Sequence, residues 1–154
     1  MAIGLLEVHL LKAKGLRGKD FLGKIDPYVI VKYKTQERKS SIASGEGGSP
    51  IWNEKVRFKV EYPGVGHDYK LILNLMDKDT FSTHDFLGQA TVYVKDLIER
   101  GVENGTSELR IQKYNVVQSD QTYCGEIQVG VTFTKMEENN GGQEYGGWKQ
   151  SYNY

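Results

Sequence analysis

Hydrophobic and polar residues alternate with a period of two along most of the chain. In residues 6–10, apolar Leu6, Val8 and Leu10 alternate with Glu7 and His9. The pattern recurs at residues 29–33, 56–60, 71–75, 90–94 and 127–133. Successive side chains of a strand point to opposite faces, so each segment is expected to form a strand with one buried face. Residues 38–44 and 106–114 are weaker candidates, which brings the prediction to about eight short strands.

One segment, Lys95–Arg100 (KDLIER), has a helical pattern, and Gly101 suits its C-terminal stop. Many short strands with a single short helix predict an all-β fold, an eight-stranded antiparallel β-sandwich. Phe86 and Leu87, which stand beside Gly88, are assigned to its core.

The periodic pattern ends near residue 135, so residues 1–135 are predicted to form one domain. Residues 136–154 are rich in Gly, Asn and Tyr and indicate a flexible Gly/Tyr-rich C-terminal tail. The alternative is that Trp148 or the terminal tyrosines dock onto the domain or a partner. The sequence does not decide between these two interpretations.

Composition narrows the class of protein. The 154 residues are 38% hydrophobic and 26% charged, with a formal net charge of zero, which indicates neither a membrane span nor a disordered chain. Residues 1–60 hold 12 Lys and Arg against 6 Asp and Glu, so the charge is uneven. The single Cys124 excludes an intramolecular disulfide and a cysteine zinc site. With no signal peptide pattern, a reducing, cytoplasmic setting is expected.

Two predicted loops are rich in carboxylates. Asp20 and Asp26 precede the strand at Pro27, whereas Asp77, Asp79 and Asp85 follow the 71–75 strand. If both loops lie at one end of the sandwich, five like charges converge and require a cation. An oxygen-only site on flexible loops favours Ca²⁺ over zinc, and over Mg²⁺ with its strict octahedral geometry. The alternative is that each Asp is an ordinary turn former.

The motifs GLLEVHLLKAKGL, D-x5-DPYV, SPIWNE and D-x-D-x5-D followed by FLG resemble a calcium-binding C2 domain over residues 3–135. A chain that begins with LLEVHLL and ends its domain with GEIQVGVTF is similar to the permuted, type II topology. The short chain with its tail most resembles the small plant C2 proteins called elicitor-responsive or 16-kilodalton phloem proteins.

The resemblance implies a ligand set for two or three Ca²⁺ ions. It consists of the side chains of Asp20, Asp26, Asp77, Asp79 and Asp85, the hydroxyl of Ser82, and the backbone carbonyls of Phe21 and Lys78. The implied function is calcium-dependent binding of anionic phospholipid membranes in plant defence or calcium signalling. The protein is then expected to be a monomer that moves from the cytoplasm to the plasma membrane when calcium rises.

Apolar residues stand among these aspartates. Phe21, Leu22 and Phe81 are expected to insert into the membrane, and each buried side chain contributes roughly 1.5–3 kcal/mol. Ile25 occupies the same loop. The alternative for each is that it packs back onto the domain.

Basic residues form a second, weaker pattern on the predicted strands, and together they would give a cationic lipid-headgroup surface. They are Lys32, Lys34, Arg38, Lys39, Lys55, Arg57 and Lys59. Some C2 domains bind phosphoinositides there, but this chain has Ile30 and Met76 where those domains often carry lysine and tryptophan. The alternative is a solvated basic face.

No arrangement of catalytic residues emerges. The three histidines, His9, His67 and His84, are scattered, and Cys124 lacks an activating neighbour. We therefore expect no enzymatic activity. The alternative function, also implied by the phloem-protein resemblance, is a mobile RNA- or protein-binding carrier or scaffold module. The basic strands would give weak, salt-sensitive RNA contact, and no aromatic stacking platform accompanies them.

Overall fold

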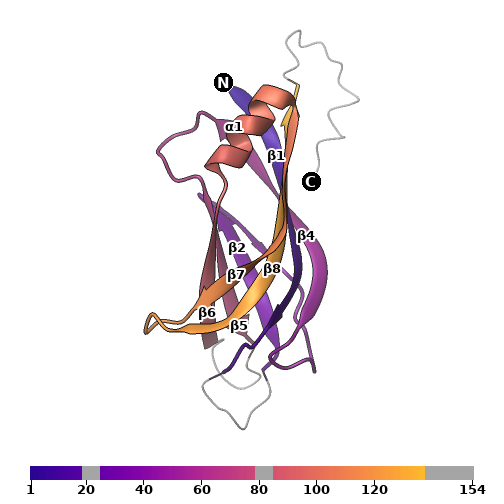
Figure 1. The fold of residues 1–154 in the computed structure, drawn as a ribbon, viewed down its shortest axis with the longest axis vertical. Coiled ribbons are helices and arrows are strands. Elements are labelled where there is room, and N and C mark those ends of the chain that lie inside the picture. Colours follow the sequence, from indigo (N-terminus) through magenta and orange to yellow (C-terminus); the bar gives the residue numbers. More distant parts are fainter. Residues whose placement is uncertain (19–24, 79–84, 138–154) are drawn as a thin grey trace.

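The computed structural model describes residues 1–18, 25–78 and 85–137, which form eight antiparallel strands and one short helix (Figure 1). This confirms the predicted all-β class. The elements are β1 (Ala2–Lys14), β2 (Pro27–Tyr33), β3 (Gln36–Lys39), β4 (Ile51–Tyr62), β5 (Lys70–Asp77), β6 (Asp85–Tyr93), α1 (Lys95–Asn104), β7 (Thr106–Val117) and β8 (Tyr123–Met136).

The strands follow the order β3-β2-β5-β6-β7-β8-β1-β4. β6 and β7 meet through one register pair, Gln89 with Val117, so the sheet divides there into two four-stranded halves. The two outer edges, β3 and β4, are tied by side chains. Gln36 Nε2 donates to the Lys59 carbonyl at 2.7 Å, and the Lys59 amide donates to Gln36 Oε1 at 3.0 Å. These bonds satisfy edge groups that would otherwise face water.

The core lies between the two halves and is built from the alternating apolar residues. Leu6, Val8 and Leu10 of β1 are fully buried, as are the inward residues of β2, β5 and β8. Phe86 is an exception, because it is 37% exposed while Leu87 is buried at 3%. A register shift after Leu75 inserts an extra residue in β6 and turns Phe86 outward. The prediction that Phe86 belongs to the core was therefore wrong.

The helix also differs from its prediction. α1 continues through Gly101 to Asn104 and is capped by Gly105, whose φ is 94°. A Cβ added at Gly101 would lie 2.1 Å from Cδ2 of Phe133, so this glycine makes room for a core aromatic ring and does not end the helix. Within the described residues, no helix has the length and apolar character that crossing a bilayer requires.

Candidate functional site

Three of the five predicted carboxylate ligands lie at one end of the sheet. Asp26 precedes β2, Asp77 ends β5 and Asp85 begins β6. Pro27 is the register partner of Asp77, and Asp77 is the partner of Asp85. α1 lies at the opposite end of the molecule (Figure 1). The structure therefore brings residues from both predicted aspartate loops, separated by about fifty positions in sequence, to one end.

Backbone amides hold two of these carboxylates in place. The Asp26 amide donates to Asp77 Oδ1 at 2.8 Å, and the Lys78 amide donates to the Asp26 carbonyl at 3.1 Å. Asp26 Oδ1 in turn accepts a bond from the Gly45 amide at 3.1 Å. Charge-assisted bonds of this kind orient a carboxylate without neutralising it. The two loops are thus connected before any ligand is present.

The loop around Gly45 is a part of this site that the sequence analysis missed. Gly45 has a φ of 80°, in the left-handed region that glycine enters without steric penalty. It belongs to the run SGEGGS between β3 and β4. Such a glycine-rich run indicates a tight loop, but only the fold shows that the loop reaches Asp26.

Asp77 and Asp85 face each other across adjacent strands. Directly opposed residues on one face of an antiparallel pair have Cβ atoms about 5 Å apart, and like charges there are destabilising. Both carboxylates are half-buried. This electrostatic arrangement fits a hard divalent cation, because oxygen ligands and converging negative charge are what Ca²⁺ requires.

Several predicted site residues lie outside the described residues: Asp20, Phe21, Leu22, Asp79, Phe81 and Ser82. In the described part of the chain, no group of three or more His, Cys, Asp or Glu side chains is placed to hold a metal ion. Ile25 packs into the core at 6% exposure, as its alternative interpretation stated. The Lys78 carbonyl stays a predicted ligand.

The register divides the predicted basic surface into two groups. Lys39 is the partner of Ile30, and Lys32 is the partner of Glu37, so these side chains share the outer side of β2 and β3. Arg38 lies on the opposite side. Its Nε donates to the Arg57 carbonyl of β4 at 3.1 Å, and its guanidinium lies 5.4 Å from the centre of the Phe58 ring. Arg38 therefore ties the edges of the sheet together.

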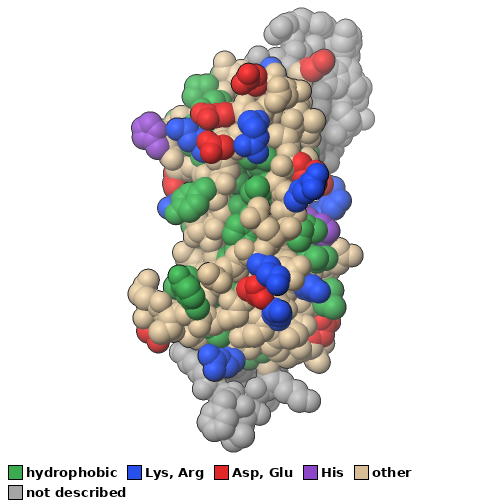
Figure 2. Space-filling model, viewed as in Figure 1, with side chains coloured by type: hydrophobic (Ala, Val, Ile, Leu, Met, Phe, Trp, Pro, Cys, Tyr) green, Lys and Arg blue, Asp and Glu red, His purple; other side chains and the backbone are tan. Residues whose placement is uncertain are grey.

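Other basic side chains have acidic neighbours. Arg57 Nε lies 2.9 Å from Glu7, and Lys32 Nζ lies 3.8 Å from Glu37. Exposed pairs of this kind contribute little stability but do reduce the local positive potential. On the face shown in Figure 2, cationic and anionic side chains are interspersed. In the described residues, Lys34, Lys39 and Lys59 have no carboxylate within ion-pair distance.

Comparison with known proteins gives the class of this fold. The family described as C2 domain matches residues 4–109. A solved C2 domain-containing protein has a TM-score of 0.68 at 36% identity, covering 90% of this chain and 94% of that one. The calcium-bound C2A- and C2B-domains of extended synaptotagmin 2 have a TM-score of 0.64 at 26% identity, covering 86% and 46%. The chain therefore belongs to the C2-domain family.

Two plant proteins are similar to this chain over nearly its full length. The 16 kDa phloem protein 1 of Arabidopsis thaliana is 54% identical over 153 residues, which is 98% of each chain. Elicitor-responsive protein 1 of Oryza sativa subsp. japonica is 51% identical over 153 residues, covering 97% of this chain and 96% of that protein. The chain belongs to this plant family of C2-domain proteins, the 16 kDa phloem and elicitor-responsive proteins, as the sequence motifs predicted.

Proposed function

We propose that this protein binds anionic phospholipid membranes reversibly and in response to Ca²⁺, through the end that carries Asp26, Asp77 and Asp85. The observation that carries the proposal is the cross-strand pairing of Asp77 with Asp85 beside Asp26. The likeness to calcium-bound C2 domains supports it. Two or three Ca²⁺ ions would be held by these residues together with Asp20, Asp79, Ser82 and the carbonyls of Phe21 and Lys78.

The mechanism follows from charge. Five aspartates repel an anionic membrane when calcium is absent. Two bound ions add four positive charges and nearly cancel the five negative ones, so that lipid phosphates are no longer repelled. The bonds from the Asp26 and Gly45 amides hold the carboxylates in position beforehand, so little rearrangement accompanies binding.

The membrane contact would be completed by two further groups. Phe21, Leu22 and Phe81 would insert at the calcium end, as their sequence positions predict. Lys39, on the outer side of β3 and nearer the calcium end than Lys32, would then contact headgroups, including phosphoinositides, whereas Lys32 is paired with Glu37 beside the far end of β2. Each basic residue near an anionic surface contributes about 1 kcal/mol. Arg38 contributes less to this contact, because its side chain bonds to β4.

The proposal extends to the architecture and the location of the protein. β1 lies between β8 and β4, which supports the type II topology. β8 ends at Met136, close to the predicted domain limit of 135, and the rest of the predicted tail beyond residue 137 lies outside the described residues. The protein would be a cytoplasmic monomer, with a role in plant defence or calcium signalling, that moves to the plasma membrane when calcium rises.

Sedimentation with phosphatidylserine-containing vesicles tests the proposal. Wild type should sediment in Ca²⁺ and stay in solution with chelator, whereas Asp77→Asn and Asp85→Asn should stay in solution in both. Glu108→Gln is a matched control, since it removes an exposed carboxylate whose cross-strand partner is the neutral Thr132. Vesicle binding that ignores both chelator and Asp77→Asn would overturn the proposal.

Two further assays on the same protein distinguish membrane binding from the alternative function as an RNA- or protein-binding carrier or scaffold. A gel shift with single-stranded RNA at low salt, insensitive to calcium, would favour the RNA carrier. Pull-down by a protein partner in the absence of vesicles would favour the scaffold. On the face shown in Figure 2, the interspersed charges give no continuous basic surface that would favour RNA.

A further inference from the structure

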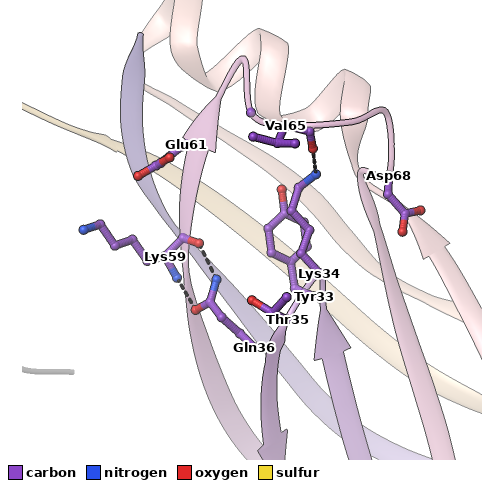
Figure 3. Close-up of a pocket in the computed structure, with 9 residues that line it drawn as sticks. Tyr33, Lys34, Thr35, Gln36, Lys59, Glu61, Val65 and Asp68 are labelled. Atoms are coloured by element: carbon purple, nitrogen blue, oxygen red, sulfur yellow. Dashed lines mark hydrogen bonds between the residues drawn. The ribbon is translucent and has the colours of Figure 1, made fainter.

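A groove lies at the end of β2 that is far from Asp26, Asp77 and Asp85. It is bounded by the β2–β3 turn, β4 and the loop that follows β4 (Figure 3). Its volume is about 700 Å³. β2 has seven residues, so the groove is about 20 Å from Asp26. Its lining includes Tyr33, Lys34, Gln36, Val65 and Asp68. Neither the fold nor the proposed calcium site requires an opening here.

Tyr33 contributes a polar group that the described residues do not satisfy. Its side chain is 1% exposed, and its hydroxyl is buried with no hydrogen-bond partner in the described part of the chain. Burial is the main reason why the pKa of this hydroxyl is raised, so it keeps its proton and remains a donor. A buried donor without an acceptor is unfavourable, and such groups are rare in folded proteins.

Lys34 covers this tyrosine. Its backbone has a φ of 52°, a conformation that a non-glycine residue adopts only at some cost. Its ammonium donates to the Val65 carbonyl at 3.0 Å and lies 4.5 Å from the centre of the Tyr69 ring. Figure 3 shows the lysine lying across Tyr33 and pointing to Val65. An ammonium has three donors, so two remain for a ligand.

We propose that the groove binds a compact oxyanion, the phosphate or carboxylate group of a small soluble molecule, between the Tyr33 hydroxyl and the Lys34 ammonium. Within the described part of the chain, the Tyr33 hydroxyl has no acceptor and the Lys34 ammonium has no carboxylate within ion-pair distance. The oxyanion would supply both. Charge-assisted bonds to two donors of this kind are short and strong. Lys34 is exposed, and its side chain can move within nanoseconds to admit the ligand.

Two carboxylates that line the groove, Glu61 and Asp68, limit its affinity for anions. Asp68 lies 3.6 Å from Lys70, which offsets part of its charge. In Figure 3, Glu61 extends away from Tyr33. The remaining repulsion disfavours polyanions and favours a ligand with a single charged group. The choice of a soluble source rests on the proposed function, because a membrane bound at the carboxylate end would leave this groove on the far side of the domain.

Amide chemical-shift titration of the full chain with inorganic phosphate tests the proposal, with acetate as the carboxylate probe. Chelator is present throughout, and sodium chloride keeps the ionic strength constant. Saturable shifts are expected at residues 33–36 and 64–68. Tyr33→Phe and Lys34→Met should each weaken binding about tenfold. Asp68→Asn should strengthen it severalfold, because it removes a negative charge from the lining of the groove. Tyr33→Phe changes no charge, so its effect separates a specific site from general attraction of anions.

Matched controls keep the result interpretable. Tyr123→Phe and Lys113→Met remove a hydroxyl and an ammonium from exposed positions outside the groove and should leave binding unchanged. Tyr33→Phe retains the ring that packs 6.2 Å from Phe58, so it should fold with a melting temperature equal to or above that of wild type.

Three outcomes would overturn the inference. The first is the absence of saturable shifts with either probe up to about 100 mM. The second is binding unchanged by Tyr33→Phe and Lys34→Met, and the third is a clear loss of stability in Tyr33→Phe, which would reveal a buried water already bonded to the hydroxyl. If the protein bound anionic vesicles without calcium, and if Tyr33→Phe abolished that binding, the ligand of the groove would be a lipid headgroup and not a soluble molecule. Because calcium is absent, failure here leaves the calcium-dependent membrane test unaffected.

Discussion

Asp85→Asn should change the stability of the protein in opposite directions with and without calcium. Asp85 faces Asp77 across β5 and β6. At a Cβ separation of about 5 Å, two unit charges repel by about 0.8 kcal/mol at the dielectric of water and by about 3 kcal/mol at an effective dielectric of 20. Both side chains are only half-buried, so the lower value is closer. Removing one charge should therefore stabilise the calcium-free protein by about 1 kcal/mol.

Thermal unfolding measures both effects. In chelator, Asp85→Asn should unfold about 2–4 °C above wild type. Calcium at one hundred times its dissociation constant stabilises the wild-type protein by about 2.7 kcal/mol, and the variant should lose most of that gain. The order of the two melting temperatures then reverses. Glu108→Gln, which faces a neutral threonine, should show neither effect. A variant less stable than wild type in chelator would refute the reasoning, because Asp85 would then be a structural carboxylate.

Three further predictions concern the scaffold. Gly101→Ala should destabilise the protein by about 1–3 kcal/mol in denaturant unfolding, because the alanine Cβ would overlap the Phe133 ring. This loss should exceed the gain in helix propensity that alanine brings. A stabilised variant would show that the Phe133 ring can move. Gln36→Ala should lower the free energy of unfolding by about 1 kcal/mol and speed hydrogen exchange of the Lys59 amide on β4, which donates to Gln36. Unchanged exchange would mean that this hydrogen bond does not stabilise the contact between β3 and β4. Tyr62 donates a hydrogen bond to Glu99, and this bond raises the pKa of the Tyr62 hydroxyl to about 12 from the usual 10.0. The resulting stability is present below pH 10 and is lost as pH rises through 12. A phenolate titration in which Glu99→Gln leaves the Tyr62 pKa unchanged would contradict the assignment.

Much of the fold can be predicted because its signal is local. Strand periodicity is set by the backbone, so residues such as Leu6, Val8 and Leu10 identify a buried face without any knowledge of partners. The same holds for the aspartate motifs, whose spacing places Asp26 and Asp77 at strand ends. These patterns predicted the eight antiparallel strands and the C2 class, and they still carry the prediction for the ligands outside the described residues.

The errors arose where a distant contact decides. Phe86 has an inward pattern in sequence, but the register shift between β5 and β6 turns it outward. Gly101 has the position of a helix stop, but Phe133, thirty-two residues later, requires the space that its missing side chain leaves. A distant contact also bears on Arg38, which stays a predicted headgroup ligand although the β2–β3 register directs its side chain to the backbone of β4.

The sequence by itself thus determined the class of fold and the strands, because each depends on spacing along one segment, and its two aspartate motifs carry the prediction of the calcium ligands. Only the tertiary structure decided which side chains reach one another. It joined Asp26 to Gly45, opposed Asp77 to Asp85, and buried the Tyr33 hydroxyl beneath Lys34 with no hydrogen-bond partner among the described residues. Those relations depend on strand register and on loop contacts between distant parts of the chain, which no local pattern records.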